Sequence, residues 1–205
     1  MQSIIKRLMD YYKYYYHNEK EFWENLGGDS YFEAFHTDKS RNEDIFTHYI
    51  DIYKPKSLID IGCGYGRYLK VISEKYPEIS LYGVDIAESQ IKKAKEYLDN
   101  ESIILSVANG THLPFEEKVF DMAITYGCFS AVKKRDLNPF FKEIIRTTRY
   151  VGVFIETYHS NNKSILNHNH YWYRHNYDKL FSNYNFSIKN LDSKDDTLFI
   201  VQLGE

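Results

Sequence analysis

Cysteine is nearly absent from the chain, which carries only Cys63 and Cys128 in 205 residues. Two thiols are too few for a disulfide scaffold or a structural zinc site, a pattern typical of a reducing compartment. No apolar run approaches the roughly 18 residues of a membrane span, and residues 1–10 lack the continuous apolar stretch of a secretory signal. We therefore expect a cytoplasmic protein that does not enter a membrane.

An excess of positive charge is also missing. Lys and Arg number 26 against 29 Asp and Glu, which gives a net charge of −3. Nucleic-acid binders depend on long-range attraction between basic side chains and phosphate, so this balance disfavours such a partner. The length of 205 residues predicts one domain, with a core large enough to fold unaided.

Short apolar runs alternate with helical patterns over most of the chain. The runs are rich in β-branched residues and lie at 58–61, 81–84, 103–107, 122–125 and 151–155. Such alternation predicts βα units around a buried parallel sheet. Two further runs, 186–189 and 197–203, are separated only by a polar stretch and predict an antiparallel hairpin that closes the sheet. We expect an α/β fold with a doubly wound, mostly parallel seven-stranded sheet.

The N-terminal residues show helical spacing instead. Apolar and aromatic side chains from Ile4 to Leu26 recur every three or four positions until Gly27 and Gly28, and a second helical pattern covers 45–53. We divide the chain into a helical cap over 1–54 and a core over 55–205. The cap is expected to cover a pocket as a lid, and a packed helix without ligand contact is the alternative.

Two helix starts in the core are marked by residue type. Ser89 is expected to cap a helix that runs through Leu98. Asn138, followed by Pro139 at the first helical position, is expected to start a helix through about Thr148.

A glycine-rich turn follows the first predicted strand and reads Asp60-Ile61-Gly62-Cys63-Gly64-Tyr65-Gly66-Arg67. Glycines there allow the backbone to turn sharply and to approach a ligand, with the amides of the next helix aimed at it. The dinucleotide fingerprint G-x-G-x-x-G requires glycine at the position of Arg67, so the turn disfavours a nicotinamide cofactor. The Asp60 carboxylate suits the cationic amino-acid end of S-adenosylmethionine.

Polar residues also follow the next two predicted strands. Asp85 comes directly after the run 81–84, where a carboxylate can accept both hydroxyls of a ribose. The third strand is followed by Asn109-Gly110-Thr111-His112-Leu113-Pro114-Phe115, which places a polar side chain and a backbone amide beside an adenine.

With these three stretches, the chain resembles the class I S-adenosylmethionine-dependent methyltransferases from about Ser57 to Tyr158. The resemblance implies a Rossmann-like fold, S-adenosyl-L-methionine as cofactor and S-adenosyl-L-homocysteine as product. It assigns cofactor binding to Asp60, Gly62, Cys63, Gly64, Gly66, Asp85, Ile86, Asn109, Gly110 and Tyr126. The family commonly has Asp at the position of Asn109, whose amide oxygen can accept from the adenine amino group in the same way. In the cap, Tyr31 and Arg41 are expected at the carboxylate end of the cofactor.

A narrower resemblance, to methylases associated with pseudaminic acid biosynthesis, rests on short stretches. These are Glu21-Phe22-Trp23, Gly28-Asp29-Ser30-Tyr31, Glu156-Thr157-Tyr158 and Asp195-Asp196-Thr197. We expect O- or N-methylation of a small polar metabolite, such as a sugar or sugar nucleotide, by a monomer or homodimer. An RNA methyltransferase and a non-catalytic S-adenosylmethionine-binding partner or sensor domain are the alternatives.

Candidate catalytic residues gather after the fifth predicted strand. Methyl transfer to a hydroxyl needs a base, for which His159 is the first candidate and His170 the second. Tyr126 is expected over the methyl group. The candidate acceptor contacts are Tyr158, Tyr171, Trp172 and Arg174.

Other readings of the same region stay open. Tyr171, Trp172 and Tyr173 could simply cover the sheet edge, and Arg174 could pair with Asp178. His168, His170 and His175 lack a well-placed carboxylate partner, so we predict no metal site. Cys128 lacks an evident basic partner and is expected to be a buried thiol.

Overall fold

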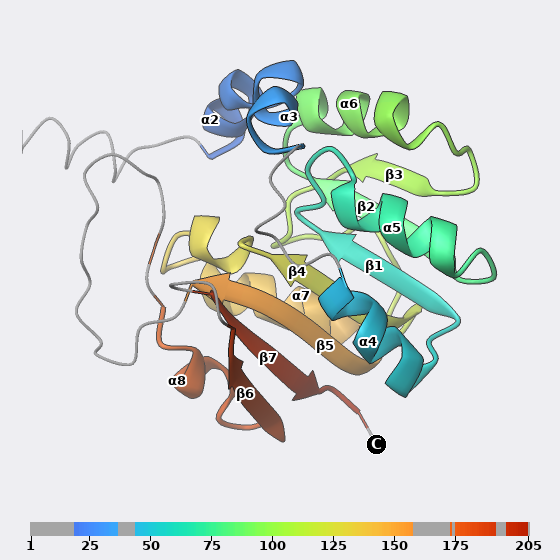
Figure 1. Ribbon diagram of the computed structural model, residues 1–205. Helices are drawn as coiled ribbons and strands as arrows, with labels where there is room; N and C mark the ends of the chain where they lie inside the picture. The colour runs from blue at the N-terminus through green and yellow to red at the C-terminus, as the bar shows by residue number, and fades with distance from the viewer. Residues whose placement is uncertain (1–18, 37–43, 158–172, 174, 192–195, 205) are drawn as a thin grey trace, which may run out of the picture.

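A computed structural model describes residues 19–36, 44–157, 173, 175–191 and 196–204 (Figure 1). Seven strands form one sheet in the order β3-β2-β1-β4-β5-β7-β6. Their bounds are β1 Ser57–Ile61, β2 Ser80–Asp85, β3 Ile104–Val107, β4 Phe120–Tyr126, β5 Thr148–Thr157, β6 Phe186–Asn190 and β7 Asp196–Gln202. Strands β1 to β5 are parallel, whereas β7 runs antiparallel to both β5 and β6. The predicted mostly parallel, seven-stranded sheet is confirmed.

Helices cover both faces of this sheet (Figure 1). Their bounds are α2 Glu19–Leu26, α3 Asp29–Phe35, α4 Asp44–Tyr53, α5 Arg67–Lys75, α6 Glu88–Leu98, α7 Leu137–Thr147 and α8 Tyr177–Phe181, with a 3-10 turn η1 over Phe129–Ala131. Side chains of α4, α5 and α6 pack on one face, and those of α7 and α8 pack on the other. No helix in the described ranges is both long enough and apolar enough to cross a membrane.

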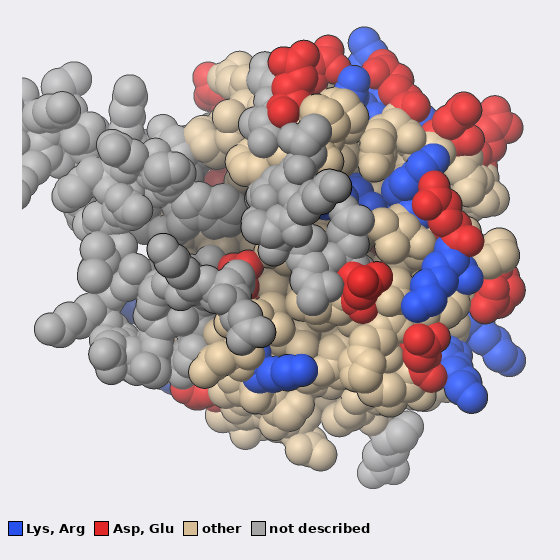
Figure 2. Space-filling view, viewed as in Figure 1, with Lys and Arg blue, Asp and Glu red and all other residues tan. Residues whose placement is uncertain are grey.

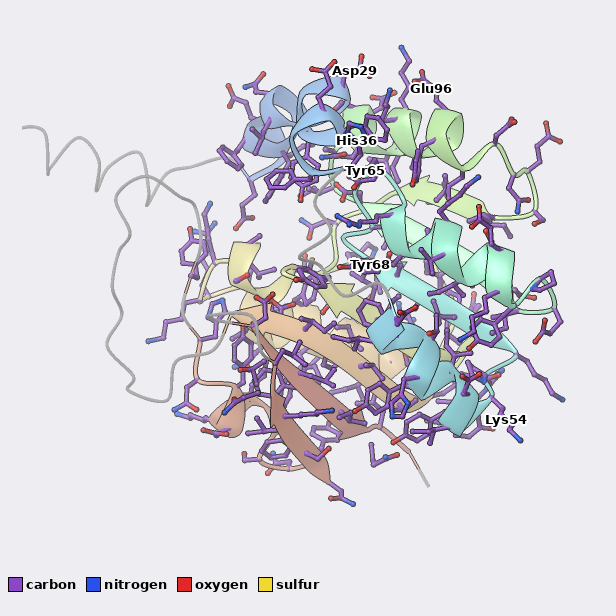
Figure 3. All side chains as sticks on the ribbon, in the orientation of Figure 1. Asp29, His36, Lys54, Tyr65, Tyr68 and Glu96 are labelled. Atoms are coloured by element: carbon purple, nitrogen blue, oxygen red, sulfur yellow. The ribbon has the colours of Figure 1, made fainter. Side chains whose placement is uncertain are left out.

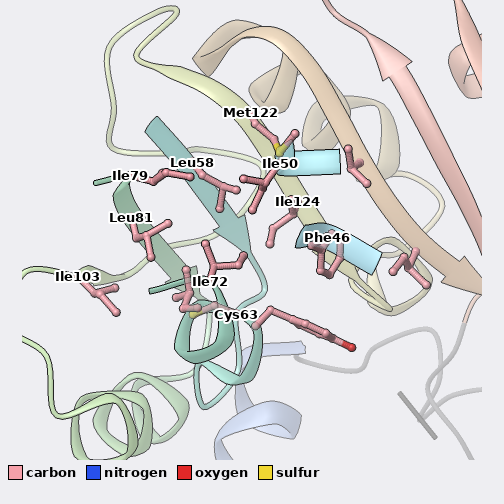
Figure 4. Close-up of a cluster of buried hydrophobic side chains, with 14 of the residues drawn as sticks. Phe46, Ile50, Leu58, Cys63, Ile72, Ile79, Leu81, Ile103, Met122 and Ile124 are labelled. Carbon is pink, nitrogen blue, oxygen red and sulfur yellow. The ribbon is translucent and has the colours of Figure 1, made fainter. Parts of the chain in front are cut away.

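Alternation along each strand builds two apolar layers. Leu58 and Ile124 lie in the layer under α4 and α5, whereas Ile59 and Ala123 lie in the layer under α7. Successive strand residues point to opposite faces, so a sheet covered on both sides needs continuous apolar runs. Figure 4 shows the first of these layers, with Phe46 and Ile50 of α4 packed on the strands.

The order of the strands reverses at β1. From there β2 and β3 follow on one side, while β4 and β5 follow on the other. At such a switch point the connections leave in opposite directions, which opens a crevice at the carboxyl ends of the strands. The glycine-rich turn starts at this point, directly after β1.

Helix starts differ from the sequence-based expectations in two places. Helix α6 begins at Glu88 with Ala87 as its N-cap residue, so the prediction that Ser89 caps the helix is wrong. Helix α7 begins at Leu137, which places Asn138 and Pro139 inside its first turn. In the cap, Gly27 and Gly28 do end a helix, but a further helix, α3, follows them at once.

Candidate functional site

A cavity of about 350 Å³ lies at the carboxyl ends of the central strands. Its wall combines the glycine-rich turn, the end of β2, the loop 108–111, the segment 126–136 and side chains of α2 and α3. Eight of the residues predicted for the cofactor line it, namely Tyr31, Gly62, Gly64, Asp85, Ile86, Asn109, Gly110 and Tyr126. Residues as far apart in sequence as Tyr31 and Tyr126 thus meet at one site, as the switch point predicts.

The glycine-rich turn is held against β2 by its backbone. The amides of Gly62 and Cys63 donate to the carbonyl of Val84 at 2.8 and 3.0 Å. Gly62 has a φ of 75° and would bring a Cβ within 2.5 Å of the Cys128 Sγ, so only glycine fits. Gly64 has a φ of 54° and lines the cavity, where a side chain would occupy space that a ligand needs.

Asp85 links the turn to helix α6. Its Oδ2 accepts a hydrogen bond from the Gly64 amide and its Oδ1 accepts one from the Ala87 amide, both at 2.9 Å. Burial raises the pKa of Asp85 to about 6, although these backbone amides act to lower it. The group is therefore mostly ionised at neutral pH, and a carboxylate has about four acceptor positions, which leaves capacity for ribose hydroxyls.

Asp60 is a second buried acid, at the end of β1. It is only 2% exposed, and its Oδ2 has no hydrogen-bond partner in the described part of the chain. Burial, together with the charge of Asp85, raises the pKa of Asp60 to about 8. Asp60 itself does not line the cavity, whereas the next two residues, Ile61 and Gly62, do. An unpaired buried carboxyl is costly, and the approach of a cationic ligand group to Asp60 stays a prediction.

Cys63 and Gly66 shape the turn without lining the cavity. The Cys63 side chain packs in the apolar layer under α5 (Figure 4), so it can offer a cofactor only its backbone. Gly66 has a φ of 84° and precedes α5 as its N-cap residue. The predicted roles of Cys63 and Gly66 are therefore limited to the shape of the backbone.

The loop after β3 is fixed by hydrogen bonds of its own. The Asn109 Oδ1 accepts from the Thr111 amide at 3.0 Å and from the Thr111 Oγ1 at 2.9 Å. Gly110 packs directly on the ring of Phe140, leaving no room there for a Cβ. The Asn109 oxygen thus already has two donors, and its contact with an adenine amino group stays a prediction.

Tyr126, the last residue of β4, stacks on the ring of Tyr68 at 5.2 Å between ring centres. Its hydroxyl donates to the Asp196 Oδ2 of β7 at 2.6 Å. The hydroxyl is therefore bonded within the protein, and the catalytic role expected for Tyr126 stays a prediction.

A buried clamp holds the turn η1, which follows β4. The Glu156 Oε1 accepts from the Thr125 Oγ1 at 2.9 Å and from the Phe129 amide at 3.0 Å, and its Oε2 accepts from the Ser130 amide at 3.1 Å. Glu156 is fully buried, which raises its pKa to about 7. Glu156 thus supports the turn that leads into Ala131 and Val132, two residues of the cavity wall, while Glu156 itself does not line the cavity.

His175 holds the same turn from α8. Its Nε2 lies 2.9 Å from the carbonyl oxygens of Phe129 and Val132, so this nitrogen must carry the proton. Cys128 lines the cavity with its Sγ packed near Gly62, and burial raises the pKa of this thiol. Cys128 is therefore half-buried in the cavity wall and not fully buried as expected, although a protonated thiol is a poor nucleophile.

Three wall residues were not among the site residues predicted from the sequence. Trp23 comes from α2 and Glu19 from its first turn. Gln90 of α6 is only 2% exposed, lines the cavity, and has an Oε1 atom with no partner among the described residues. Gln90 looks like an ordinary helical residue in sequence, but in the structure its side chain lies close to both Gly27 of the cap and Gly64 of the turn.

Several predicted residues lie outside the described residues. They are Arg41 in the cap and Tyr158, His159, His170, Tyr171, Trp172 and Arg174 after β5. Their roles at the cofactor carboxylate, as bases and as acceptor contacts stay predictions.

Comparisons with known proteins agree with this geometry. A family model described as a methyltransferase domain matches residues 58–152. An uncharacterized protein of Methanocaldococcus jannaschii, MJ1252, is 30% identical over 159 residues, which are 75% of this chain and 59% of that protein. Norajmaline N-methyltransferase of Rauvolfia serpentina is 27% identical over 145 residues, which cover 60% of this chain and 49% of the plant enzyme. The chain thus spans about half the length of these curated relatives.

The fold has solved counterparts. Human N-acetylserotonin methyltransferase, determined in complex with S-adenosylmethionine, superposes with a TM-score of 0.68 and 17% identity over 86% of this chain and 55% of the human one. The similarity in fold therefore covers more of the chain than residues 58–152, which the family model matches. Gly64 and the carboxylate of Asp85 both line the cavity, and their predicted contacts with the cofactor of such proteins stay predictions. Residues 58–152 therefore carry a methyltransferase domain, and the chain has the fold of the class I S-adenosylmethionine-dependent methyltransferases, with S-adenosylmethionine as its cofactor.

Proposed function

We propose that this chain transfers a methyl group to an oxygen or nitrogen atom of a small polar metabolite, such as a sugar or sugar nucleotide. S-adenosylmethionine supplies an activated methyl carbon, so the protein has mainly to orient the two reactants and exclude water. The observation that carries the proposal is one cavity in which cofactor residues and charged side chains share a wall. Asp85 and Gly64 stand on the cofactor side, and Glu19, Arg135 and Asp136 complete the wall.

The charged part of the wall supports a polar acceptor. The Arg135 Nε lies 3.2 Å from the Asp136 Oδ2, and the Arg135 side chain is 74% exposed. Paired charges of both signs offer donors and acceptors together, as polyhydroxylated or phosphorylated metabolites require. Norajmaline N-methyltransferase, by its name, also methylates nitrogen of a small molecule.

An RNA acceptor is the second candidate, and the surface argues against it. On the face shown in Figure 2, acidic and basic side chains interleave instead of forming one basic area. The net charge of −3 agrees with that picture. Phosphate backbones bind chiefly through clusters of Lys and Arg, so we rank RNA below a small metabolite.

Cofactor binding is tested first, by thermal unfolding. We expect S-adenosylmethionine and S-adenosylhomocysteine to raise the melting temperature and NAD to leave it unchanged, because a ligand at 100 times its Kd stabilises by about 2.7 kcal/mol. Asp85→Ala should remove most of the shift, since it deletes the acceptor proposed for the ribose. Glu101→Ala, at an exposed acid, is the matched control.

The acceptor is tested next, with a methyl-labelled cofactor. We expect label to enter small hydroxylated or amino-bearing metabolites, sugar nucleotides among them, and not total RNA. Transfer to RNA alone would replace the proposal with the second candidate. Cofactor binding without transfer to either pool would favour a non-catalytic binding domain.

A further inference from the structure

Helix α6 begins without a capping side chain of its own. Its N-cap residue, Ala87, has φ −94° and ψ 123° and makes no side-chain hydrogen bond. The first amides of a helix have no partners within it and need an acceptor from elsewhere. Here the acceptor is Glu24 of α2, whose Oε1 and Oε2 accept from the amides of Glu88 at 2.6 Å and Ser89 at 3.0 Å.

Further contacts hold helices α2 and α3 against α6. The Ser89 Oγ donates to the carbonyl of Glu24 at 3.3 Å. Lys93, one helical turn later, lies 2.6 Å from the Asp29 Oδ1 of α3, and its Nζ is 4.7 Å from the centre of the Phe32 ring. In Figure 3, Asp29 lies at the top of the view, where α3 and α6 are neighbours. The cap therefore docks on α6 along about two turns, with Glu24 at the end nearest the cavity.

That end of α6 carries the cofactor wall. Asp85 and Ile86 precede the helix and Gln90 lies in its first turn, and all three line the cavity. The Asp85 Oδ1 accepts from the Ala87 amide, so two carboxylates from distant parts of the chain share the amides at one helix start. Trp23 and Tyr31 of the cap also line this cavity.

We propose that Glu24 is a positioning residue for the cofactor site. Its carboxylate caps α6, where the side chain of Ala87 cannot, and so couples docking of α2 and α3 to cofactor binding. A carboxylate at a helix N-terminus is also favoured by the helix dipole. When the cap is docked, the start of α6 is fixed and Asp85 points its remaining acceptor positions into the cavity. The inference concerns cofactor binding alone and stands whatever the acceptor is.

The test measures cofactor affinity by calorimetry in four variants of the full chain. Glu24→Gln keeps the size of the side chain but leaves one acceptor for two amides, so we expect the Kd for S-adenosylmethionine to rise roughly five- to twentyfold. Glu33→Gln removes the same charge from an exposed position of α3 and should leave the Kd within about twofold of wild type. Both variants are first checked for unchanged folding by circular dichroism.

Rescue distinguishes capping from any other role of Glu24. The backbone at Ala87 is already extended, as N-cap residues are, so Ala87→Ser or Ala87→Asp can supply a local cap. We expect Glu24→Gln combined with either change to regain most of the lost affinity. Hydrogen exchange at the Ser89 amide should be faster in Glu24→Gln than in wild type and should slow in the combined variants. A wild-type Kd for Glu24→Gln overturns the proposal, as does failure of both Ala87 changes to restore affinity.

Discussion

A single carboxyl, Asp60, makes the cofactor site sensitive to protonation. Its pKa of about 8 in the free chain comes from burial and from the charge of Asp85, so the group is mostly protonated at pH 7. A cationic ligand group placed beside it favours the ionised form. We expect S-adenosylmethionine binding to release about one proton at pH 7 and almost none at pH 9, as measured by calorimetry in buffers of different ionisation enthalpy.

The matched variant is Asp60→Asn, which preserves shape and removes the titration. It should bind the cofactor more weakly and release no proton at either pH. A wild-type binding enthalpy that does not depend on the buffer at pH 7 would show that no cation approaches Asp60.

At the scale of one element, the turn η1 depends on Glu156. This carboxylate, fully buried, receives hydrogen bonds from the Thr125 hydroxyl and from the amides of Phe129 and Ser130. Glu156→Gln turns an amide NH2 toward groups that are themselves donors and leaves at least one of them unpaired. We expect the free energy of unfolding in urea at pH 8 to fall by about 1–3 kcal/mol.

Thr125→Val is the control for that prediction, since it removes only one donor and leaves the carboxylate with its backbone partners. Its unfolding free energy should fall by less than that of Glu156→Gln. Equal urea midpoints for wild type and Glu156→Gln would mean that the turn does not need the charge.

For the whole molecule, three buried acids set the response to pH. The pKa values are about 8 for Asp60, about 6 for Asp85 and about 7 for Glu156, all raised by burial. Between pH 5 and 8 the folded chain then binds more protons than the unfolded chain, whose carboxyls have a pKa near 4. Stability is therefore greatest near the acid end of this window and falls as pH rises through 6 to 8.

The measurement is the melting temperature of the free protein. We expect it to be lower at pH 8 than at pH 5.5 by roughly 5 °C or more, and Asp60→Asn to flatten the dependence. Saturating cofactor should also reduce the difference, because it gives Asp60 a charged partner. A melting temperature that rises between these pH values would contradict raised pKa values for the three acids.

The strands, the glycine turn and the place of Asp85 follow from local features of the sequence. Apolar runs and turn residues act over a few neighbouring positions, so 58–61 and 81–84 lie within β1 and β2 as predicted. Parallel strands bring their carboxyl ends to one edge, which is why Gly64, Asp85 and Asn109 line one cavity. The hairpin of β6 and β7 was also readable from its two runs and short polar connection.

Only the tertiary structure decided which strand of that hairpin joins β5, and it is β7. It also decided how α6 is capped, because the acceptor, Glu24, lies 65 positions before Ser89. Residue type at the helix start predicted Ser89 as the capping residue. In the structure the Glu24 carboxylate of α2 accepts from the first amides of α6 instead. The raised pKa of Asp60 and the burial of Gln90 have the same origin, since burial depends on elements that meet only when the whole chain has folded.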